Sequence, residues 1–194
     1  MSEESADASG APPGPADYAR ACVESCVLGR PLPPPPEHPF FTRRAACFVS
    51  LKKHGELRGC IGTLEPAAAH LGAEIARNAR SAAFHDPRFH RVRADELPEL
   101  TCSVDVLSPS APCAAADLDP AVFGVIVLAG SRRGVLLPDL QGVDTVGQQV
   151  DIALQKAGIG PNEAFTVERF TVTRCHEGEP PRDDEVEGQP ARSS

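Results

Sequence analysis

The sequence has 194 residues, of which 41% are hydrophobic, a composition typical of one globular domain and not of a disordered chain. It contains no apolar run of about 18 residues, so no transmembrane helix is expected. The net charge is −8, but residues 1–17 and 176–194 each carry −4 and leave residues 18–175 neutral, which argues against general nucleic-acid binding.

The two ends of the chain are predicted to be disordered acidic tails. Residues 1–15 and 177–194 are rich in Pro, Gly, Ser, Glu and Asp and lack apolar periodicity. The first fifteen residues also lack basic residues and an apolar stretch, so they are no signal peptide. The odd number of cysteines, seven, favours a reduced set, and we expect a cytoplasmic protein with one folded domain over residues 16–176.

Hydrophobic periodicity predicts helices and strands in alternation between these tails. The expected elements, in chain order, are a helix over 17–29, a proline-rich connector over 31–39, strands over 46–53 and 56–63, a helix from Pro66 to Ala82, a strand over 100–107, strands over 122–129 and 134–138, a helix over 143–157 and a strand over 164–175. Strands joined by hairpins and interrupted by helices predict an α+β fold with a mostly antiparallel sheet flanked by helices.

The first hairpin carries the most informative residues. A two-residue turn at His54-Gly55 suits the positive φ that such turns require, and it would place Val49 opposite Cys60. Side-chain alternation would then put Cys60 on the same face as Arg58, about 7 Å away. Two interpretations stay open at this point: a small buried hydrophobe, or a reactive thiol whose pKa Arg58 lowers.

Two glycines, Gly59 and Gly62, flank the pair Cys60-Ile61 within this second strand. Glycine weakens a strand, so we expect another group to approach the backbone closely here. A helix that starts at Pro66, directly after the strand, would present free N–H groups near Arg58 and form an anion site. Ordinary packing of strand and helix is the alternative.

The segment 84–90 is a compact polar and aromatic loop. Asp86 can cap a turn and Arg88 can pair with it, or both can line a cleft beside Cys60. No metal site is expected, because Cys22 and Cys26 fit core packing and no zinc-binding pattern occurs. No cofactor is predicted.

One segment, 48–63, contains the motif Leu57-Arg58-Gly59-Cys60-Ile61-Gly62-Thr63, and four more are 78–89, 96–100, 103–108 and 134–145. Together these segments resemble the AMMECR domain family, and the last is similar to its bacterial branch. The resemblance covers roughly residues 18–175. It implies an α+β domain with a larger and a smaller lobe and a cleft at the signature strand. It also implies component A of a bacterial system, AmmeMemoRadiSam, whose other members are a Memo-like protein and a radical S-adenosylmethionine protein.

Two classes of function follow. In the first, the protein is an enzyme in which Cys60 is the nucleophile, Arg58 holds an anionic small molecule, and His85 or Asp86 relays a proton. The candidate ligand-binding residues are Arg58, Gly59, Gly62, Thr63 and Arg88. In the second, the protein is a non-catalytic binding or adaptor module for the two partner proteins. RNA or nucleotide binding is a weaker third hypothesis, since no aromatic and basic platform is evident in the sequence.

Overall fold

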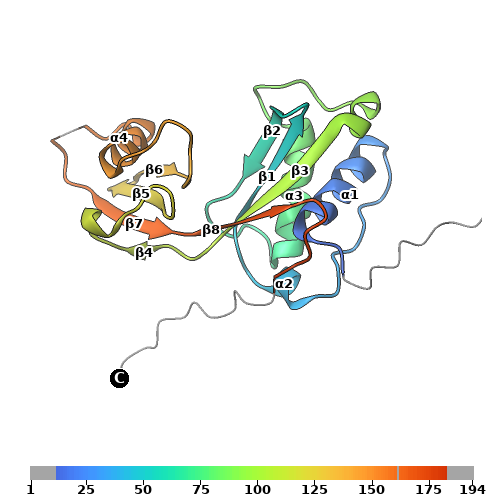
Figure 1. Ribbon diagram of the computed structural model, residues 1–194, viewed down its shortest axis with the longest axis horizontal. Helices are drawn as coiled ribbons and strands as arrows, with labels where there is room; N and C mark the ends of the chain where they lie inside the picture. Colours follow the sequence, from blue (N-terminus) through green and yellow to red (C-terminus); the bar gives the residue numbers. More distant parts are fainter. Residues whose placement is uncertain (1–11, 161, 183–194) are drawn as a thin grey trace, which may run out of the picture. The chain divides into compact units, whose positions relative to one another are not determined.

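The chain forms two compact units (Figure 1). The structure is a computed structural model that describes residues 12–160 and 162–182. The first unit comprises residues up to Val104 and from Cys175 onward, and the second comprises Asp105–Arg174. The fold is α+β with two antiparallel sheets flanked by helices, as the sequence predicted, although we expected one sheet. No helix among the described residues is long and apolar enough to span a bilayer.

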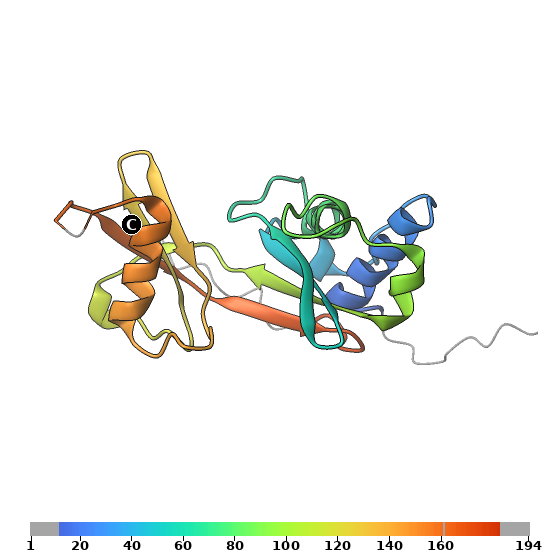
Figure 2. The same cartoon turned by 90° about the horizontal axis from the view of Figure 1, so that it is seen from above.

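The first unit is built around a four-stranded sheet whose strand order is β2-β1-β3-β8. Its elements are α1 (Pro15–Val27), α2 (Pro39–Thr42), β1 (Cys47–Lys53), β2 (Glu56–Gly62), α3 (Leu71–Phe84), the 3-10 helix η1 (Ala94–Glu99), β3 (Leu100–Leu107) and β8 (Val172–His176). The strands β3 and β8 continue across the boundary of the unit. Helix α3 packs on β1 and β2, and α1 packs beside α3 (Figure 2).

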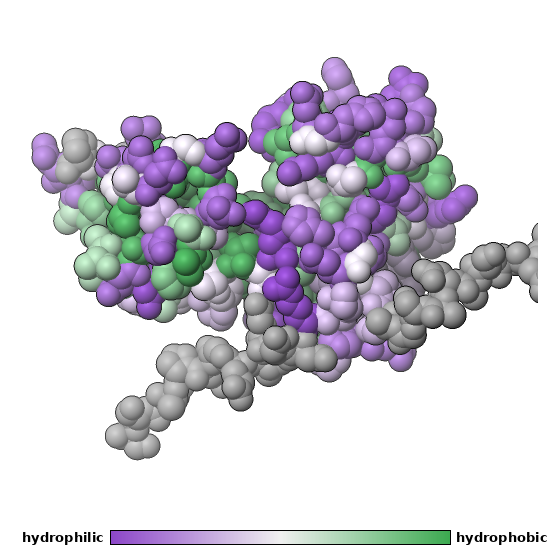
Figure 3. All heavy atoms as spheres, in the orientation of Figure 1, coloured by the Kyte–Doolittle hydropathy of each residue, from purple (hydrophilic) through white to green (hydrophobic). Residues whose placement is uncertain are grey.

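The second unit has its own sheet, with strand order β4-β7-β5-β6. Its elements are β4 (Ala111–Pro112), the 3-10 helix η2 (Ala115–Asp117), β5 (Gly124–Ala129), β6 (Arg132–Leu136), α4 (Val146–Ala157) and β7 (Thr166–Phe170). A compact apolar cluster fills the space between this sheet and α4; its buried members are Leu118, Val125, Val127, Leu136, Ala153, Leu154 and Ile159. In the view of Figure 3, hydrophilic residues predominate over the first unit, and more hydrophobic surface shows on the second.

The first hairpin forms where it was expected, but its predicted register is wrong beyond the turn. His54 and Gly55 have φ values of 53° and 83°, and Lys53 pairs with Glu56. A β-bulge then follows, so that Leu51 pairs with Gly59 and Ser50 pairs with Cys60. Arg58 is the extra residue of the bulge. Because one added residue reverses every side chain beyond it, Cys60 lies on the face opposite to the predicted one.

Two other boundaries differ from expectation. Helix α3 begins at Leu71 and not at Pro66, with the His70 side chain accepting a hydrogen bond from the N–H of Ala73 at 3.2 Å. The expected strand over 164–175 is two strands in two different sheets, because Thr171 leaves the ladder and exchanges hydrogen bonds with Ser108.

Residues 177–182, which we expected in a tail, contact the first unit. The Glu177 carboxylate accepts a hydrogen bond from the N–H of Cys102 at 2.6 Å, and the N–H of Gly178 donates to Asp17 at 2.9 Å. Pro181 is buried. At the other end, Gly14 and Pro15 of the expected N-terminal tail are buried, and α1 begins at Pro15; residues 1–11 and 183–194 lie outside the described residues.

Candidate functional site

The Cys60 thiol lies on the sheet face that α3 leaves uncovered. Cys47, Val49 and Leu51 of β1 point toward α3 and are fully buried, whereas Ser50 and Cys60 are half-buried. The Ser50 hydroxyl donates a hydrogen bond to Cys60 Sγ at 3.2 Å. Of the seven cysteines, only Cys26, Cys60 and Cys113 are not buried. The corrected register therefore makes Cys60 more accessible than the predicted one did.

An ion pair from the loop after α3 holds the backbone of Cys60. The carboxylate of Asp86 accepts from the N–H of Cys60 at 2.8 Å, and the guanidinium of Arg88 donates to the Cys60 carbonyl at 3.3 Å. Strand β2 is an edge strand, so this ion pair occupies backbone groups that a further strand would otherwise bind. Asp86 and Arg88 thus both pair with each other and line the signature strand.

Both carboxylate oxygens of Asp86 accept hydrogen bonds in this arrangement. Its side chain is 2% exposed, and it also accepts from the backbone N–H, Nε and Nη2 of Arg88 at 2.8–3.1 Å. These hydrogen bonds, with that of Arg88 the strongest cause, hold the pKa of Asp86 far below its usual range. A carboxylate in this state is a poor proton acceptor, which weakens the hypothesis of a proton relay through Asp86.

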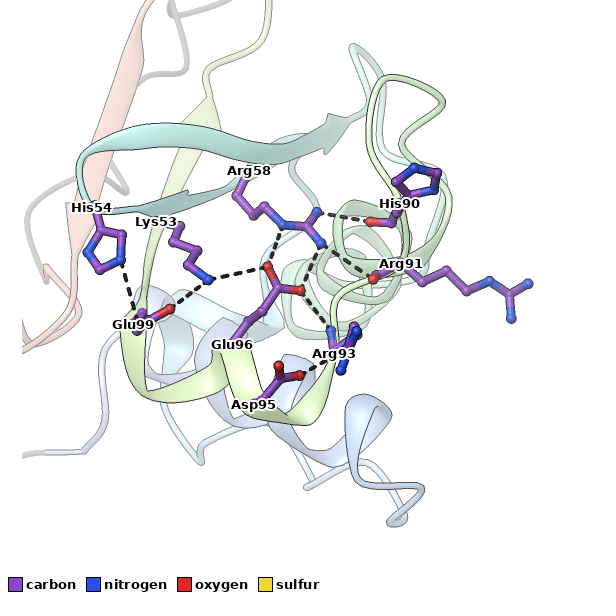
Figure 4. A network of polar contacts seen from close by, with 9 residues as sticks. All are labelled: Lys53, His54, Arg58, His90, Arg91, Arg93, Asp95, Glu96 and Glu99. Carbon is purple, nitrogen blue, oxygen red and sulfur yellow. Dashed lines mark hydrogen bonds and ion pairs between the residues drawn. The ribbon is translucent and has the colours of Figure 1, made fainter.

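Arg58 is bound by its own chain (Figure 4). Its Nε and Nη2 each lie 2.9 Å from a carboxylate oxygen of Glu96, and Nη1 donates to the carbonyl of His90 at 2.9 Å. A weaker hydrogen bond runs from Nη2 to the carbonyl of Arg91 at 3.4 Å. Four of the five N–H donors of a guanidinium are therefore engaged.

Glu96 is the centre of this network. Its hydrogen bond with Arg58 is the main cause that lowers its pKa to about 2, and Lys53 adds a weaker attraction from 3.8 Å. Lys53 in turn pairs with Glu99 at 2.6 Å. Sequence reasoning missed this role of Glu96, although the residue stood in one of the segments that resemble the family. The network joins the bulge of β2 to the loop 90–93 and to η1.

The two glycines of the signature strand meet groups of the protein itself. A Cβ at Gly59 would lie 2.4 Å from the carbonyl oxygen of Ala82 in α3, and a Cβ at Gly62 would lie 2.3 Å from the ring of Phe48. The predicted close approach to this backbone is confirmed, and within the described residues the approaching groups are a helix and an aromatic ring.

The anion site expected after the signature strand holds a carboxylate of the chain. Glu74, fully buried in the first turn of α3, accepts from the N–H groups of Ala67 and Ala68 at 2.9 and 2.6 Å. It also accepts from the Thr63 hydroxyl. The sequence signal that we overlooked is an acidic residue in the first helical turn, which commonly binds free N–H groups.

The predicted proton relay through His85 has no geometric support. His85 is exposed, caps the end of α3 through its backbone, and stands edge-on to the Phe84 ring at 6.5 Å. No hydrogen bond joins it to Cys60 in the part of the chain that the structure describes. Likewise, no group of three or more His, Cys, Asp or Glu side chains within 12–160 and 162–182 is placed to hold a metal ion.

A shallow pocket of about 360 Å³ lies beside the signature strand. It is lined by Arg58, Pro87, Arg88, Phe89 and His90, all from the first unit. The bulge residue of β2 and the loop 86–93 therefore meet at one concave surface.

Comparison with known proteins identifies the family. The AMMECR1 family model matches residues 16–175, and the chain belongs to this family. A protein of Thermotoga maritima is 48% identical over 163 residues, which cover 81% of this chain and 94% of that protein. A protein of Clostridium acetobutylicum is 51% identical over 130 residues, 67% of this chain, but the match spans only 28% of that longer protein.

The fold has a solved relative. The crystal structure of an uncharacterized protein from Pyrococcus horikoshii superposes with a TM-score of 0.73 and 27% sequence identity, covering 86% of this chain and 91% of that one. Archaeal relatives such as a Methanosarcina acetivorans protein, 31% identical over 188 residues, also match, so the family is not confined to bacteria.

Proposed function

We propose that the protein is a non-catalytic binding component that acts together with other proteins. The partners we propose are those that the family resemblance implies, a Memo-like protein and a radical S-adenosylmethionine protein, in the cytoplasm. The observation that carries the proposal is the state of the charged groups around Cys60. Arg58 pairs with Glu96, and Asp86 pairs with Arg88 and the backbone of Cys60, so these groups stiffen the strand and its loop.

The state of the thiol supports the same proposal. An adjacent general base is one of the ways in which a cysteine nucleophile is activated, and the hydrogen-bond partner of the Cys60 side chain among the described residues is the Ser50 hydroxyl, which is not such a base. The Clostridium acetobutylicum relative adds a second argument, because the matching region forms only 28% of that protein. A domain of this family can therefore be one part of a larger assembly on a single chain.

The test is a pull-down of the full chain with the Memo-like and radical S-adenosylmethionine proteins of the same genome, paired with cellular complementation. We expect Cys60→Ala to retain both partner binding and complementation. Cys113→Ala, which removes another half-buried thiol in the second unit, is the matched control. Absence of binding to either partner would contradict the proposal.

An enzyme with Cys60 as nucleophile is the second candidate, and one observation favours it. The thiol is half-buried on the sheet face that α3 leaves uncovered, and the guanidinium of Arg88 donates a hydrogen bond to the carbonyl of the same residue at 3.3 Å. The cation near the thiol is thus Arg88. This candidate predicts that Cys60→Ala binds the partners normally but fails to complement, whereas Cys113→Ala complements.

A further inference from the structure

We propose that the pocket lined by Arg58, Pro87, Arg88, Phe89 and His90 binds a small organic phosphate. Its volume of about 360 Å³ lies at the lower end of the range for small-molecule sites. Three of the five lining residues carry cationic or protonatable nitrogen groups, and none carries a carboxylate. The inference concerns a small-molecule site and does not rest on the proposed function.

The structure shows which nitrogen groups are still available to a ligand. Arg58 has four hydrogen bonds to its own chain and contributes mainly to the wall. Arg88 uses Nε and Nη2 for Asp86 and Cys60, while its Nη1 has no hydrogen-bond partner among the described residues, and 55% of its side chain is exposed. The role that the sequence suggested for Arg58 therefore passes to Arg88.

The available donors are held in place before any ligand arrives. Asp86, itself buried, fixes the plane of the Arg88 guanidinium with two hydrogen bonds of 3.0 and 2.8 Å. Arg58 donates a hydrogen bond to the carbonyl of His90 and so holds the backbone of this exposed residue, which lines the pocket. Immobilised donors lose less conformational entropy on binding, which favours affinity.

The remaining walls determine the class of ligand. Phosphate oxygens accept charge-assisted hydrogen bonds from guanidinium groups, so Arg88 Nη1 with His90 suits a phosphate. Phe89 and Pro87 add apolar rings, and the guanidinium of Arg88 lies 5.5 Å from the centre of the Phe89 ring. A phosphate monoester on a compact, flat apolar group satisfies both kinds of wall.

The test is a titration of the full chain with phenyl phosphate, followed by calorimetry or by amide shifts in NMR at pH 8. Inorganic phosphate and phenol are the two comparison ligands, one without the apolar group and one without the phosphate. We expect saturable binding of phenyl phosphate that is at least about tenfold tighter than that of either comparison ligand. Absence of saturable binding of phenyl phosphate would overturn the proposal. So would an affinity for inorganic phosphate or for phenol that equals the affinity for phenyl phosphate.

Two variants distinguish the pocket from a general positive field. His90→Glu adds a negative charge to the lining of the pocket, and Arg91→Gln removes a positive charge from the same loop outside the pocket. Both residues are exposed, but the Arg91 side chain is no part of the pocket lining and extends away from the network in Figure 4. We expect His90→Glu to weaken binding at least about tenfold and Arg91→Gln less than about threefold.

If both variants weaken the binding of phenyl phosphate equally, the binding depends on the overall positive charge of the loop. That result would overturn the proposal of a specific pocket. Melting temperatures within about 2 °C of the parent chain would show that both variants fold. If His90→Glu melts lower, His90→Gln replaces it, with the same direction of change expected and the same contradiction if binding is unaltered. Failure of this test leaves partner binding untouched, because the pull-down uses no phosphate ligand.

Discussion

The two hairpins β1–β2 and β5–β6 share one way of packing against a helix and differ in the polar groups around it. In the first, Gly59 of β2 lies against the carbonyl of Ala82 in α3; in the second, Gly134 of β6 lies against the carbonyl of Ala153 in α4. Each glycine lets a helix backbone approach a strand more closely than any side chain would permit. The β5–β6 hairpin keeps a regular register, whereas the β1–β2 hairpin has a bulge at Arg58.

The polar groups are distributed unequally between these hairpins. Around the first stand Glu74, Asn78 and Asp86, all buried and all hydrogen-bonded. Beneath the second lies an apolar cluster. The buried Gln149 side chain of α4 donates to the Phe123 carbonyl at 2.7 Å, while its Oε1 has no hydrogen-bond partner among the described residues. Buried polar groups cost free energy unless they are satisfied, so their concentration at the signature strand marks it as the part of the fold where more than packing is specified.

The largest effect on stability is expected from adding a methyl group at Gly59 or Gly134, the glycine that each hairpin packs against a helix. Gly134→Ala would place a Cβ 1.9 Å from the Ala153 oxygen, and Gly59→Ala would place one 2.4 Å from the Ala82 oxygen. Both helices must shift, so we expect each change to lower the free energy of unfolding by about 2–5 kcal/mol, with Gly134→Ala the more severe. Urea denaturation measures both.

Gly147→Ala in α4 is the control, since its Cβ would meet no atom closer than 4.0 Å. Alanine is the better helix former, so this change should be neutral or stabilise by up to about 1 kcal/mol. If Gly59→Ala leaves the free energy of unfolding unchanged while Gly134→Ala lowers it, the two glycines do not have the same packing role. The two hairpins would then not share this feature.

The next effect separates the hairpins, because the ion pair of the first is far more buried than that of the second. The side chains of Arg58 and Glu96 are 15% and 14% exposed, whereas those of Arg132 in β6 and its partner Glu163 are 43% and 45% exposed. Glu96→Gln replaces the partner of Arg58 by an amide that accepts with one oxygen only. The Glu96 side chain is 14% exposed, and we expect a loss of about 1–3 kcal/mol at pH 7. The pKa of Glu96 is depressed to about 2, so its contribution is complete above the unfolded value near 4.5 and is lost as the pH falls toward 2.

Denaturation of both chains between pH 7 and pH 2.5 provides the measurement. The stability gap between parent and Glu96→Gln should be constant above about pH 5 and should narrow below it. Arg58→Lys should also lower the melting temperature, since an ammonium group cannot reproduce the fork. A gap independent of pH would show that Glu96 acts through packing and not through its charge.

The hairpins also show what local sequence can and cannot predict. The turn at His54-Gly55 and the stop of α4 at Gly158 were predicted correctly, because positive φ is a property of single residues. The bulge at Arg58 was not, because its causes lie far along the chain: Ala82 presses on Gly59, and Glu96 binds Arg58.

The candidate site followed the same rule. Asp86 and Arg88 contact the backbone of Cys60, which was one of the two alternatives that the sequence left open, but the partners of Arg58 could not be assigned from spacing. The start of α3 was placed too early because the N–H groups of Ala67 and Ala68 have Glu74 as an acceptor and need no helix there. Each of these contacts joins residues of different segments, and hydrophobic periodicity within a segment does not predict contacts between segments.

A smaller effect is expected at the C-terminal end of the first unit. Ending the chain at Arg182 keeps the contacts of Glu177 and Gly178, whereas ending it at His176 removes the acceptor of the Cys102 N–H. We expect the shorter chain to be less stable by about 1–2 kcal/mol, with a melting temperature lower by a few degrees. Equal melting temperatures would mean that residues 177–182 contribute nothing to the unit, as the sequence alone had suggested.

The smallest effect on stability is expected from a substitution at Cys60, although this residue lies in the signature strand of the first hairpin. Cys60→Ala removes one half-buried thiol and its hydrogen bond with Ser50, so the free energy of unfolding should change by less than about 1 kcal/mol. The thiol should instead be distinguished by its reactivity. Burial raises the pKa of Cys26 and of Cys113, the other two cysteines that are not buried, which slows their reaction with an alkylating agent.

Native alkylation with iodoacetamide, followed by mass spectrometry of peptides, orders the seven thiols. We expect Cys60 to be modified first, Cys26 and Cys113 next, and the four buried cysteines only after denaturation. Modification of Cys113 ahead of Cys60 would place the accessible thiol in the second unit and would remove the strongest reason for regarding the first hairpin as the functional one. If instead Cys60 reacts first and Cys60→Ala still complements, the thiol is exposed but dispensable, and the polar groups around it serve to hold a binding surface and not a nucleophile.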